Sequence, residues 1–169
     1  MQEVEAILSF GSNQGLKIDN LKTSIIYLKD KCNILSISPI YETLSLLRDN
    51  QENYYNLIVV ISTNLSIFDL ITFIHHIEQT MGRKRDKIWA SRIIDIDIID
   101  YDNQVYSSPL VTVPHYGITE RSFVLYPLKD VKPDYIHPVS SKSVSDMIES
   151  LQDDLGIKQV DEFIDIKNI

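Results

Sequence analysis

The chain of 169 residues is 44% hydrophobic and 24% charged, and 16 basic residues against 24 acidic ones give a formal net charge of -8 at pH 7. This length and composition predict one globular domain over residues 1–169 and exclude a disordered or fibrous chain. The negative charge disfavours general binding to nucleic acid or to an anionic membrane surface. No apolar run reaches the roughly 18 residues that cross a bilayer. A single cysteine and the lack of a secretory signal at the first residues favour the reducing cytoplasm.

Strands and helices alternate along the first hundred residues. Apolar or alternating runs predict strands over 4–10, 33–43, 54–63 and 93–101. Pro39 favours an edge or a bulge in the second of these strands, because proline donates no ladder hydrogen bond. Apolar residues at helical spacing predict one helix that starts near Asn20, with Asp19 or Asn20 as its N-cap. A second helix is predicted over 66–82, and its Ser-x-x-Asp start resembles a capping box.

The resulting order of elements, β-α-β-β-α-β, is typical of ferredoxin-like α+β domains. We therefore expect a mainly antiparallel sheet backed by two helices. After this unit the sequence predicts a hairpin around Asp102 and Asn103, a loop over 114–117 and a short helix over 143–151. Nothing in the sequence indicates a second domain or an internal repeat.

Asp95 and Asp97 lie two residues apart on the last predicted strand, so their carboxylates project from the same side. Oxygen ligands of this kind bind hard cations such as Mg²⁺. A solvated strand face is the usual explanation of a lone acidic pair, because short motifs often match by chance. Two adjacent acidic side chains nevertheless repel each other unless a positive charge lies between them. The pair is therefore a candidate magnesium site.

A cluster of basic residues precedes this acidic strand. Five of the 16 basic residues fall within ten positions: Arg83, Lys84, Arg85, Lys87 and Arg92. In an acidic chain such a cluster favours capture of an anion such as a polyphosphate, which arginine grips through paired hydrogen bonds. The alternative is an ordinary charged helix end.

Aromatic and amide side chains accompany these charges. Trp89 lies within the basic cluster and could stack on a nucleobase or close over a site, although a lone Trp is more often a packing anchor. His115 adds an imidazole and Phe123 adds an aromatic ring. Taken in isolation, His115 is expected to have a structural role. Asn56 can recognise an amide-bearing heterocycle or simply begin a strand. The GSN sequence at 11–13 lacks the second glycine and the lysine of a Walker A loop.

Together these residues resemble the 6-hydroxymethyl-7,8-dihydropterin pyrophosphokinase family of folate biosynthesis. The resemblance rests on the order and spacing of short motifs: FGSN at 10–13, YET at 41–43, YYN at 54–56, GRKR at 82–85, W-x-x-R-x-x-D-x-D at 89–97, and VPHY at 113–116 followed by Arg121 and Phe123. It implies a ferredoxin-like domain that transfers a pyrophosphoryl group from ATP to the pterin hydroxymethyl group and releases AMP. The expected cofactor is Mg²⁺ as two ions, and we expect a monomer without nucleic-acid or membrane partners.

The resemblance also implies roles for individual residues. Those expected to be catalytic are Arg83, Arg85, Arg92, Asp95 and Asp97, of which the two aspartates hold both metal ions. Those expected to line the ATP site are Glu78, Trp89, Ile98, Thr112, His115, Tyr116 and Arg121. Those expected to bind the pterin are Thr43, Leu46, Tyr54, Asn56 and Phe123, with the rings of Tyr54 and Phe123 on either side of it.

Some positions depart from the family pattern. No proline stands at 90–91 before Arg92, Leu44 replaces a second proline, and a histidine at 75 or 76 replaces a glutamine. These differences bear on loop closure and ATP contacts more than on the type of reaction.

The expected reaction is in-line attack of the pterin hydroxyl on the β-phosphorus of ATP. Asp95 and Asp97 would hold the metal, and the arginines would neutralise charge that develops toward AMP. The sequence indicates no general base. Two alternatives stay open: a nucleotide- or pterin-binding module without turnover, and an RNA-binding ferredoxin-like domain. The charge of -8 and the lack of an RNP-like motif disfavour the second alternative.

Overall fold

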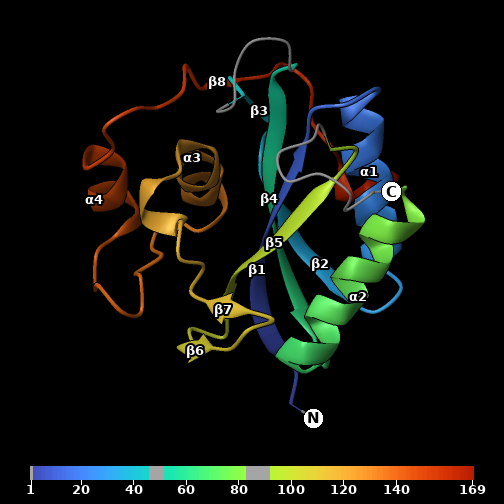
Figure 1. The fold of residues 1–169 in the computed structure, drawn as a ribbon, viewed down its shortest axis with the longest axis horizontal. Helices are drawn as coiled ribbons and strands as arrows, with labels where there is room; N and C mark the ends of the chain where they lie inside the picture. The colour runs from blue at the N-terminus through green and yellow to red at the C-terminus, as the bar shows by residue number, and fades with distance from the viewer. Residues whose placement is uncertain (1, 46–51, 83–91) are drawn as a thin grey trace.

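The computed structural model describes residues 2–45, 52–82 and 92–169. Its centre is an antiparallel sheet with helices on both faces (Figure 1). The two longest strands, β1 (Val4–Ser12) and β4 (Tyr54–Thr63), pair over nine residues. The strand order is β5-β1-β4-β3-β8, with β2 also paired to β4. The bounds of the other strands are β2 (Asn33–Ile37), β3 (Tyr41–Thr43), β5 (Asp95–Tyr101) and β8 (Lys158–Gln159).

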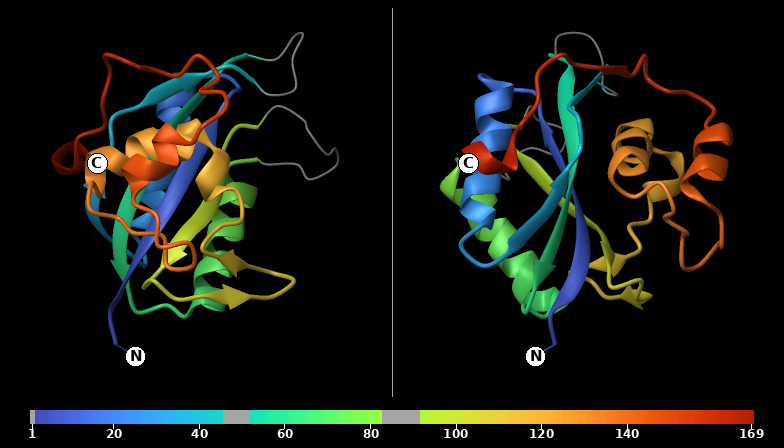
Figure 2. Two further views of the ribbon diagram at one scale, coloured as in Figure 1. Left: turned by 90° about the vertical axis from the view of Figure 1, so that its left-hand side faces the viewer. Right: turned by 180° about the vertical axis from the view of Figure 1, so that it is seen from behind.

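Helices cover the sheet in two layers. One layer holds α1 (Lys17–Leu28) and α2 (Ile67–Thr80), and the opposite layer holds α3 (Ser122–Val131) and α4 (Val144–Glu149), as Figure 1 and Figure 2 show. Leu8 and Ile96 point into the core under the first layer, whereas Ile7 and Ile99 point into the core under the second. Because successive strand residues face opposite sides, the continuous apolar runs of the interior strands supply both cores. None of the helices in the described ranges is long and apolar enough to span a membrane.

The predicted ferredoxin-like arrangement is confirmed, but the single strand predicted over 33–43 is wrong. The chain forms β2 and β3 there, and both pair with β4. Between them, the Ser38 N–H donates to the Ile58 carbonyl and the Ser38 hydroxyl accepts from the Ile58 N–H, each at 2.9 Å. Pro39 follows without an N–H of its own, so the regular ladder stops at this point.

The predicted N-cap of the first helix is also wrong. Helix α1 begins at Lys17, Leu16 occupies the N-cap position without a side-chain cap, and Asp19 lies in the first turn. The Asn20 side chain bonds away from its own helix, donating to the Ser12 hydroxyl at 3.2 Å. The polar side chains near this helix start therefore tie the helix to the end of β1 rather than cap it.

Helix α2 begins as the sequence predicts. The Ser66 hydroxyl accepts a hydrogen bond from the Asp69 N–H at 3.2 Å, which satisfies one of the free donors of the first turn. The helix ends at Thr80, and Gly82 follows with a φ of 88°. Glycine enters this left-handed region without steric cost, so it terminates the helix as expected.

The turn predicted around Asp102 and Asn103 is present, but the strand that follows it does not pair with the strand before it. Both residues form a turn, with φ values of 54° and 53°. The next strand, β6 (Tyr106–Ser107), pairs with β7 (Thr112–Val113) in a separate two-stranded ribbon and not with β5.

Helix α3 was not predicted, whereas α4 was. Buried residues at helical spacing in α3 include Val124, Leu125 and Leu128, but Pro127 lies within the same stretch. A proline inside a helix obscures the helical pattern because it normally breaks one. Helix α4 lies within the predicted range 143–151 and starts with a complete capping box.

Candidate active site

The two aspartates predicted to bind a cation lie side by side on β5. Asp95 pairs with Gly11 and Asp97 pairs with Ser9 on β1. Both side chains are half-buried, while Ile96 between them is buried in the core under α1 and α2. The two carboxylates therefore share the opposite face of the sheet, as the alternation of the sequence predicts.

Arg92 places a positive charge directly beside this pair. Its guanidinium donates a hydrogen bond to the Asp95 carboxylate and forms an ion pair with it. Burial lowers the pKa of Arg92, but the charge of Asp95 and their hydrogen bond outweigh burial, so the pKa is raised overall. Tyr54 and Asp97 also lie within electrostatic range of this guanidinium. A fixed cation beside two carboxylates is an arrangement that can hold phosphate oxygens and a metal together.

Asn13, which the sequence interpretation did not single out, holds Arg92 in position. Its side-chain oxygen accepts from the Arg92 N–H at 2.7 Å, and its own N–H donates to the Arg92 carbonyl at 3.1 Å. Its side-chain nitrogen donates to the Glu52 carbonyl at 3.4 Å. Asn13 is only 1% exposed. Asn13, directly after β1, therefore joins Arg92, three residues before β5, to Glu52, two residues before β4.

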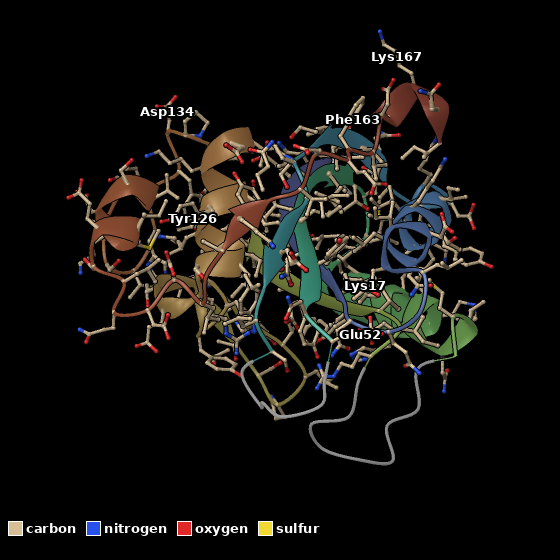
Figure 3. All side chains as sticks on the ribbon, turned by 90° about the horizontal axis from the view of Figure 1, so that it is seen from above. Lys17, Glu52, Tyr126, Asp134, Phe163 and Lys167 are labelled. Carbon is tan, nitrogen blue, oxygen red and sulfur yellow. The ribbon has the colours of Figure 1, made fainter. Side chains whose placement is uncertain are left out.

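The start of β4 is anchored a second time, by Lys17 of α1. The Lys17 ammonium donates to the Asn53 carbonyl at 3.1 Å and forms an ion pair with Glu52 at 3.5 Å. It also lies 4.5 Å from the centre of the Tyr55 ring. Figure 3 shows Lys17 and Glu52 close together at this end of the sheet. The strand that carries Tyr54 and Asn56 is thus fixed at its first residues.

A buried amide lies next to the acidic pair. The Asn56 side chain donates to the Thr43 hydroxyl at 3.0 Å, and both residues are buried. A Cβ built on Gly11 would lie 3.1 Å from the Asn56 side-chain oxygen and 3.7 Å from the Tyr54 ring. Glycine at position 11 therefore leaves room for these two side chains beside Asp95.

His115 flanks the acidic strand on its other side. Its N–H donates to the Ile99 carbonyl at 2.8 Å, which ties the loop after β7 to β5. Its Nδ1 accepts from the Gly117 N–H at 3.1 Å, so the proton of the neutral ring is on Nε2. Burial and the positive charge of Arg121 lower the pKa of His115 to about 4, although Asp95 opposes this shift. His115 is therefore a neutral hydrogen-bond donor near pH 7.

Arg121 lies across Gly117 and between two aromatic rings. A Cβ built on Gly117 would come within 2.5 Å of the Arg121 Nε. The Arg121 guanidinium carbon lies 5.4 Å from the Tyr116 ring centre and 5.7 Å from that of Phe123. The Tyr116 ring in turn stacks on His115 at 4.5 Å. Glycine at 117 thus permits a position of the guanidinium that any larger residue would block.

Three further residues predicted to line the ATP site have other surroundings. Glu78 is buried in α2, and its carboxylate accepts from the Ile96 N–H at 2.9 Å, which braces β5 between the two aspartates. The Ile98 side chain is buried in the core, so only its main chain can face a nucleotide. Thr112 lies on β7, and its hydroxyl is 3.5 Å from that of Ser107.

Four predicted site residues lie outside the described residues: Leu46, Arg83, Arg85 and Trp89. Apart from Glu78, Ile98 and Thr112, the others include two groups on one face of the sheet. One group is charged and surrounds Asp95, and the other contains Thr43, Asn56 and Tyr54. The sequence interpretation missed Asn13 and Gly117, whose roles depend on neighbours far away in sequence. The available signal for Asn13 was its place in the FGSN motif, and that for Gly117 was its place in the loop over 114–117, which carries His115 and Tyr116.

The acidic pair fits Mg²⁺, although the described residues contain no group of three or more His, Cys, Asp or Glu side chains suited to a metal. Mg²⁺ keeps several waters and is often bound by one or two carboxylates together with substrate phosphates. Asp95 and Asp97 are hard oxygen donors on one face of one strand. A pair of this kind suffices for a metal that arrives with a nucleotide.

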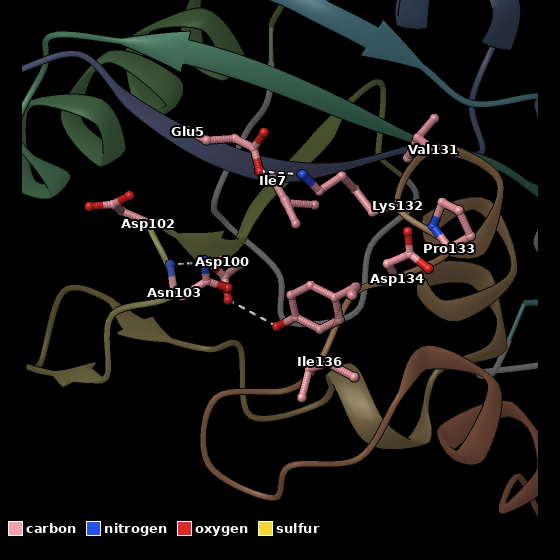
Figure 4. A pocket seen from close by; sticks show the side chains of 11 residues that line it. Glu5, Ile7, Asp100, Asp102, Asn103, Val131, Lys132, Pro133, Asp134 and Ile136 are labelled. Carbon is pink, nitrogen blue, oxygen red and sulfur yellow. Dashed lines mark hydrogen bonds and ion pairs between the residues drawn. The ribbon is translucent and has the colours of Figure 1, made fainter.

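A cavity of about 420 Å³ lies at the other end of β1 and β5 (Figure 4). Its polar groups already bond to one another. The Tyr135 hydroxyl donates to the Asp100 carboxylate at 2.9 Å, and Lys132 pairs with Glu5 at 2.7 Å. Burial raises the pKa of Asp100. This cavity is a polar structural cluster, separate from the acidic pair.

The fold is a ferredoxin-like α+β domain, and one face of its sheet carries an acidic pair suited to a cation. Residues 7–133 match the family described as 7,8-dihydro-6-hydroxymethylpterin-pyrophosphokinase (HPPK). The chain belongs to this family.

Named relatives agree with this assignment. The chain is 34% identical over 139 residues to the 2-amino-4-hydroxy-6-hydroxymethyldihydropteridine pyrophosphokinase of Aquifex aeolicus, covering 82% of this chain and 87% of that protein. It is 28% identical over 157 residues to the protein of the same name from Haemophilus influenzae, covering 92% and 98% of the two chains. It is 36% identical over 148 residues to the folic acid synthesis protein fol1 of Schizosaccharomyces pombe, covering 86% of this chain and 20% of fol1. The chain thus spans a fifth of the length of that longer relative.

Solved structures show the same fold. The crystal structure of Plasmodium falciparum HPPK-DHPS wild type with SDX-DHP aligns with a TM-score of 0.70 at 16% identity, over 88% of this chain and 44% of that one. A second HPPK-DHPS crystal structure, described as a complex with substrates, aligns with a TM-score of 0.68 at 17% identity, over 88% of this chain and 43% of that one.

Proposed function

We propose that this chain transfers the terminal pyrophosphoryl group of ATP to the hydroxymethyl oxygen of 6-hydroxymethyl-7,8-dihydropterin, with release of AMP. Family membership supports this reaction. The observation that carries it is the position of Asp95 and Asp97, which share one face of β5 with the Arg92 guanidinium bound to Asp95. Charge of both signs fixed within one small region suits a reaction in which phosphate charge must be held and then redistributed.

In this reaction the pterin hydroxyl oxygen forms a bond to the β-phosphorus of ATP and loses its proton to the solvent. The bond from the β-phosphorus to the oxygen that bridges the α- and β-phosphates breaks, and its electron pair leaves with AMP. Asp95 and Asp97 would hold two Mg²⁺ ions, which neutralise phosphate charge when bound. Arg92 lies where it can donate to the phosphate oxygens that become more negative.

The nucleotide and the pterin would occupy opposite sides of Asp95. His115 offers its Nε2–H, and Arg121 offers a guanidinium held against Gly117, so this side suits the nucleotide. On the other side, the Asn56 amide can recognise the edge of a pterin through its donor and acceptor groups. The rings of Tyr54 and Phe123 are available to stack on the flat faces of the pterin.

The direct test is incubation of the protein with ATP, Mg²⁺ and 6-hydroxymethyl-7,8-dihydropterin, followed by separation of the nucleotides. We expect AMP and pterin diphosphate in equal amounts. Formation of ADP would instead indicate a single phosphoryl transfer and would contradict the proposal. Nucleotide binding without AMP formation would identify a binding module that lacks turnover.

A further inference from the structure

A tight turn at Asp153–Gly156 connects α4 to β8, beyond the residues that match the family. Leu155 and Gly156 both have left-handed φ values, 57° and 60°. The Asp153 carboxylate accepts from the Leu155 N–H at 2.7 Å, and the Asp154 carboxylate accepts from the Gly156 N–H at 2.9 Å. These bonds fix the directions of two successive carbonyl groups, those of Asp154 and Leu155.

The two carbonyls bind two different elements. The Asp154 carbonyl accepts from the buried Ser122 hydroxyl at 2.8 Å, at the first residue of α3. The Leu155 carbonyl accepts from the Leu44 N–H at 3.2 Å, one residue after β3. A Cβ built on Gly156 would lie 3.8 Å from the Leu44 side chain, so the turn also packs against Leu44. Two successive peptide units therefore link the start of α3 to the end of β3.

The chain after the turn strengthens the attachment to β3. Strand β8 pairs Gln159 with Tyr41 and Lys158 with Glu42, and the Lys158 ammonium lies 2.8 Å from the Glu42 carboxylate. In Figure 1 this segment runs from α4 across the top of the sheet to β3. The C-terminal segment is thus paired with Tyr41 and Glu42 of β3, and its hydrogen bond to α3 is made by Ser122, the first residue of that helix.

Both linked elements carry residues proposed to bind the pterin. Thr43 directly precedes Leu44, and Phe123 directly follows Ser122. We infer that the Asp153–Gly156 turn is a positioning element that sets the separation between the Thr43 side and the Phe123 side of the pterin site. This inference rests on the proposed function. The Asn56 amide, bonded to Thr43, would meet the edge of the ring and Phe123 one of its flat faces, so both contacts form together only at a fixed separation of the two elements. Hydrogen bonds hold such a separation because their distance and angle vary little.

Two substitutions remove the two hydrogen bonds separately. Ser122→Ala removes the hydroxyl that binds the Asp154 carbonyl. Leu44→Pro removes the N–H that binds the Leu155 carbonyl, and the extended conformation of Thr43 in β3 is compatible with a following proline. Helix α3 keeps a separate attachment to the sheet, since the Tyr41 hydroxyl donates to the Asp130 carboxylate at 2.7 Å. Both variants are therefore expected to fold.

Matched controls separate the link from general stability. Ser24→Ala removes an equally buried hydroxyl in α1, which donates to the Leu21 carbonyl at 2.7 Å. Leu44→Ala removes most of the leucine side chain, as Leu44→Pro does, but keeps the main-chain N–H.

Binding is measured by titration calorimetry. The protein is first titrated with Mg²⁺ and α,β-methylene-ATP, whose altered bridge blocks transfer, and 6-hydroxymethylpterin is then added to the loaded protein.

We expect Ser122→Ala and Leu44→Pro each to weaken pterin binding by roughly 3- to 10-fold, the effect of losing one hydrogen bond. The nucleotide affinity should fall less than the pterin affinity, because the Arg121 side chain on the nucleotide side lies against Gly117 and not against the turn. Ser24→Ala should bind the pterin like wild type, and Leu44→Ala should bind it more tightly than Leu44→Pro.

Three results would overturn the inference: unchanged pterin affinity in both variants, an equal loss of nucleotide and pterin affinity, or the same loss in Ser24→Ala. Failure of the proposed function gives a different result, because wild type itself would then bind no pterin. In that case the inference falls together with the function.

Discussion

Asn13 and Arg92 are joined by two hydrogen bonds in opposite directions. The Arg92 N–H donates to the Asn13 side-chain oxygen, and the Asn13 N–H donates to the Arg92 carbonyl. The main chain of Arg92 is thereby fixed to the end of β1, and its side chain is free to bind Asp95 on β5. An arginine held in this way needs little reorganisation to bind a phosphate.

Replacement of Asn13 by alanine tests this relationship. Asn13→Ala leaves the Arg92 N–H without its side-chain acceptor, so we expect the free energy of unfolding to fall by about 1 to 3 kcal/mol. Turnover should fall by roughly tenfold or more, because Arg92 is no longer fixed. Chemical denaturation and AMP release measure the two effects. Asn33→Ala is the control, since Asn33 is exposed on β2. Turnover equal to wild type in folded Asn13→Ala would show that the link does not matter for catalysis.

The acidic pair should be indispensable for turnover but not for folding. Asp97→Asn keeps the size of the side chain and removes its charge, so we expect kcat to fall by roughly 100-fold or more. The melting temperature should remain close to that of wild type, because the half-buried carboxylate faces the site rather than the core. The exposed Asp19→Asn on α1 provides a control of the same chemistry. Normal AMP release by Asp97→Asn would refute the metal-binding role.

Gly117→Ala should displace Arg121 with little loss of stability. The φ of Gly117 is -94°, which alanine adopts readily, but the new Cβ would meet the Arg121 side chain at 2.5 Å. The flexible side chain must move, so we expect KM for ATP to rise by roughly tenfold, as for the loss of a charged hydrogen bond. In an Arg121→Ala background the same glycine change should have almost no further effect. Additive effects of the two changes would exclude this explanation.

His115 should remain neutral throughout the physiological range of pH. Its pKa is lowered to about 4, first by burial and then by Arg121. A lowered pKa means that the folded state resists protonation, so its contribution to stability is complete above pH 6.5 and is lost as the pH falls toward 4. NMR titration of the metal-free protein should show the His115 ring titrating near pH 4. A His115 midpoint near 6.5 would contradict the buried environment.

His115→Asn provides the complementary test. Its side-chain oxygen can replace Nδ1 as the acceptor for the Gly117 N–H, so the loop should keep its conformation. Between pH 6.5 and pH 4, we expect the free energy of unfolding of the variant to fall less than that of wild type, as measured by denaturation at each pH. An identical loss in both proteins would assign the pH dependence to other groups.

Local patterns in the sequence were sufficient for β1, β4 and β5, for the second helix and for the acidic pair. The side chains of a strand alternate with a period of two, so Asp95 and Asp97 had to share a face wherever the strand lay. The Ser66 cap depends only on residues three positions apart. Helix α3 was missed because Pro127 interrupts a helical pattern that burial against the sheet nevertheless stabilises.

Only the tertiary structure decided which groups meet at the site. Asn13 and Arg92 are 79 residues apart, and Ser122 meets the Asp154 carbonyl across 32 residues. The pairing register of the strands and the packing of α3 bring such groups together, and neither is written in the spacing of nearby residues. The amino-acid sequence therefore determined which chemical groups the protein carries and on which strand face they lie. Their distances and the direction of the His115 pKa shift followed only from the folded chain, because hydrogen bonds and burial act between segments that are remote in sequence.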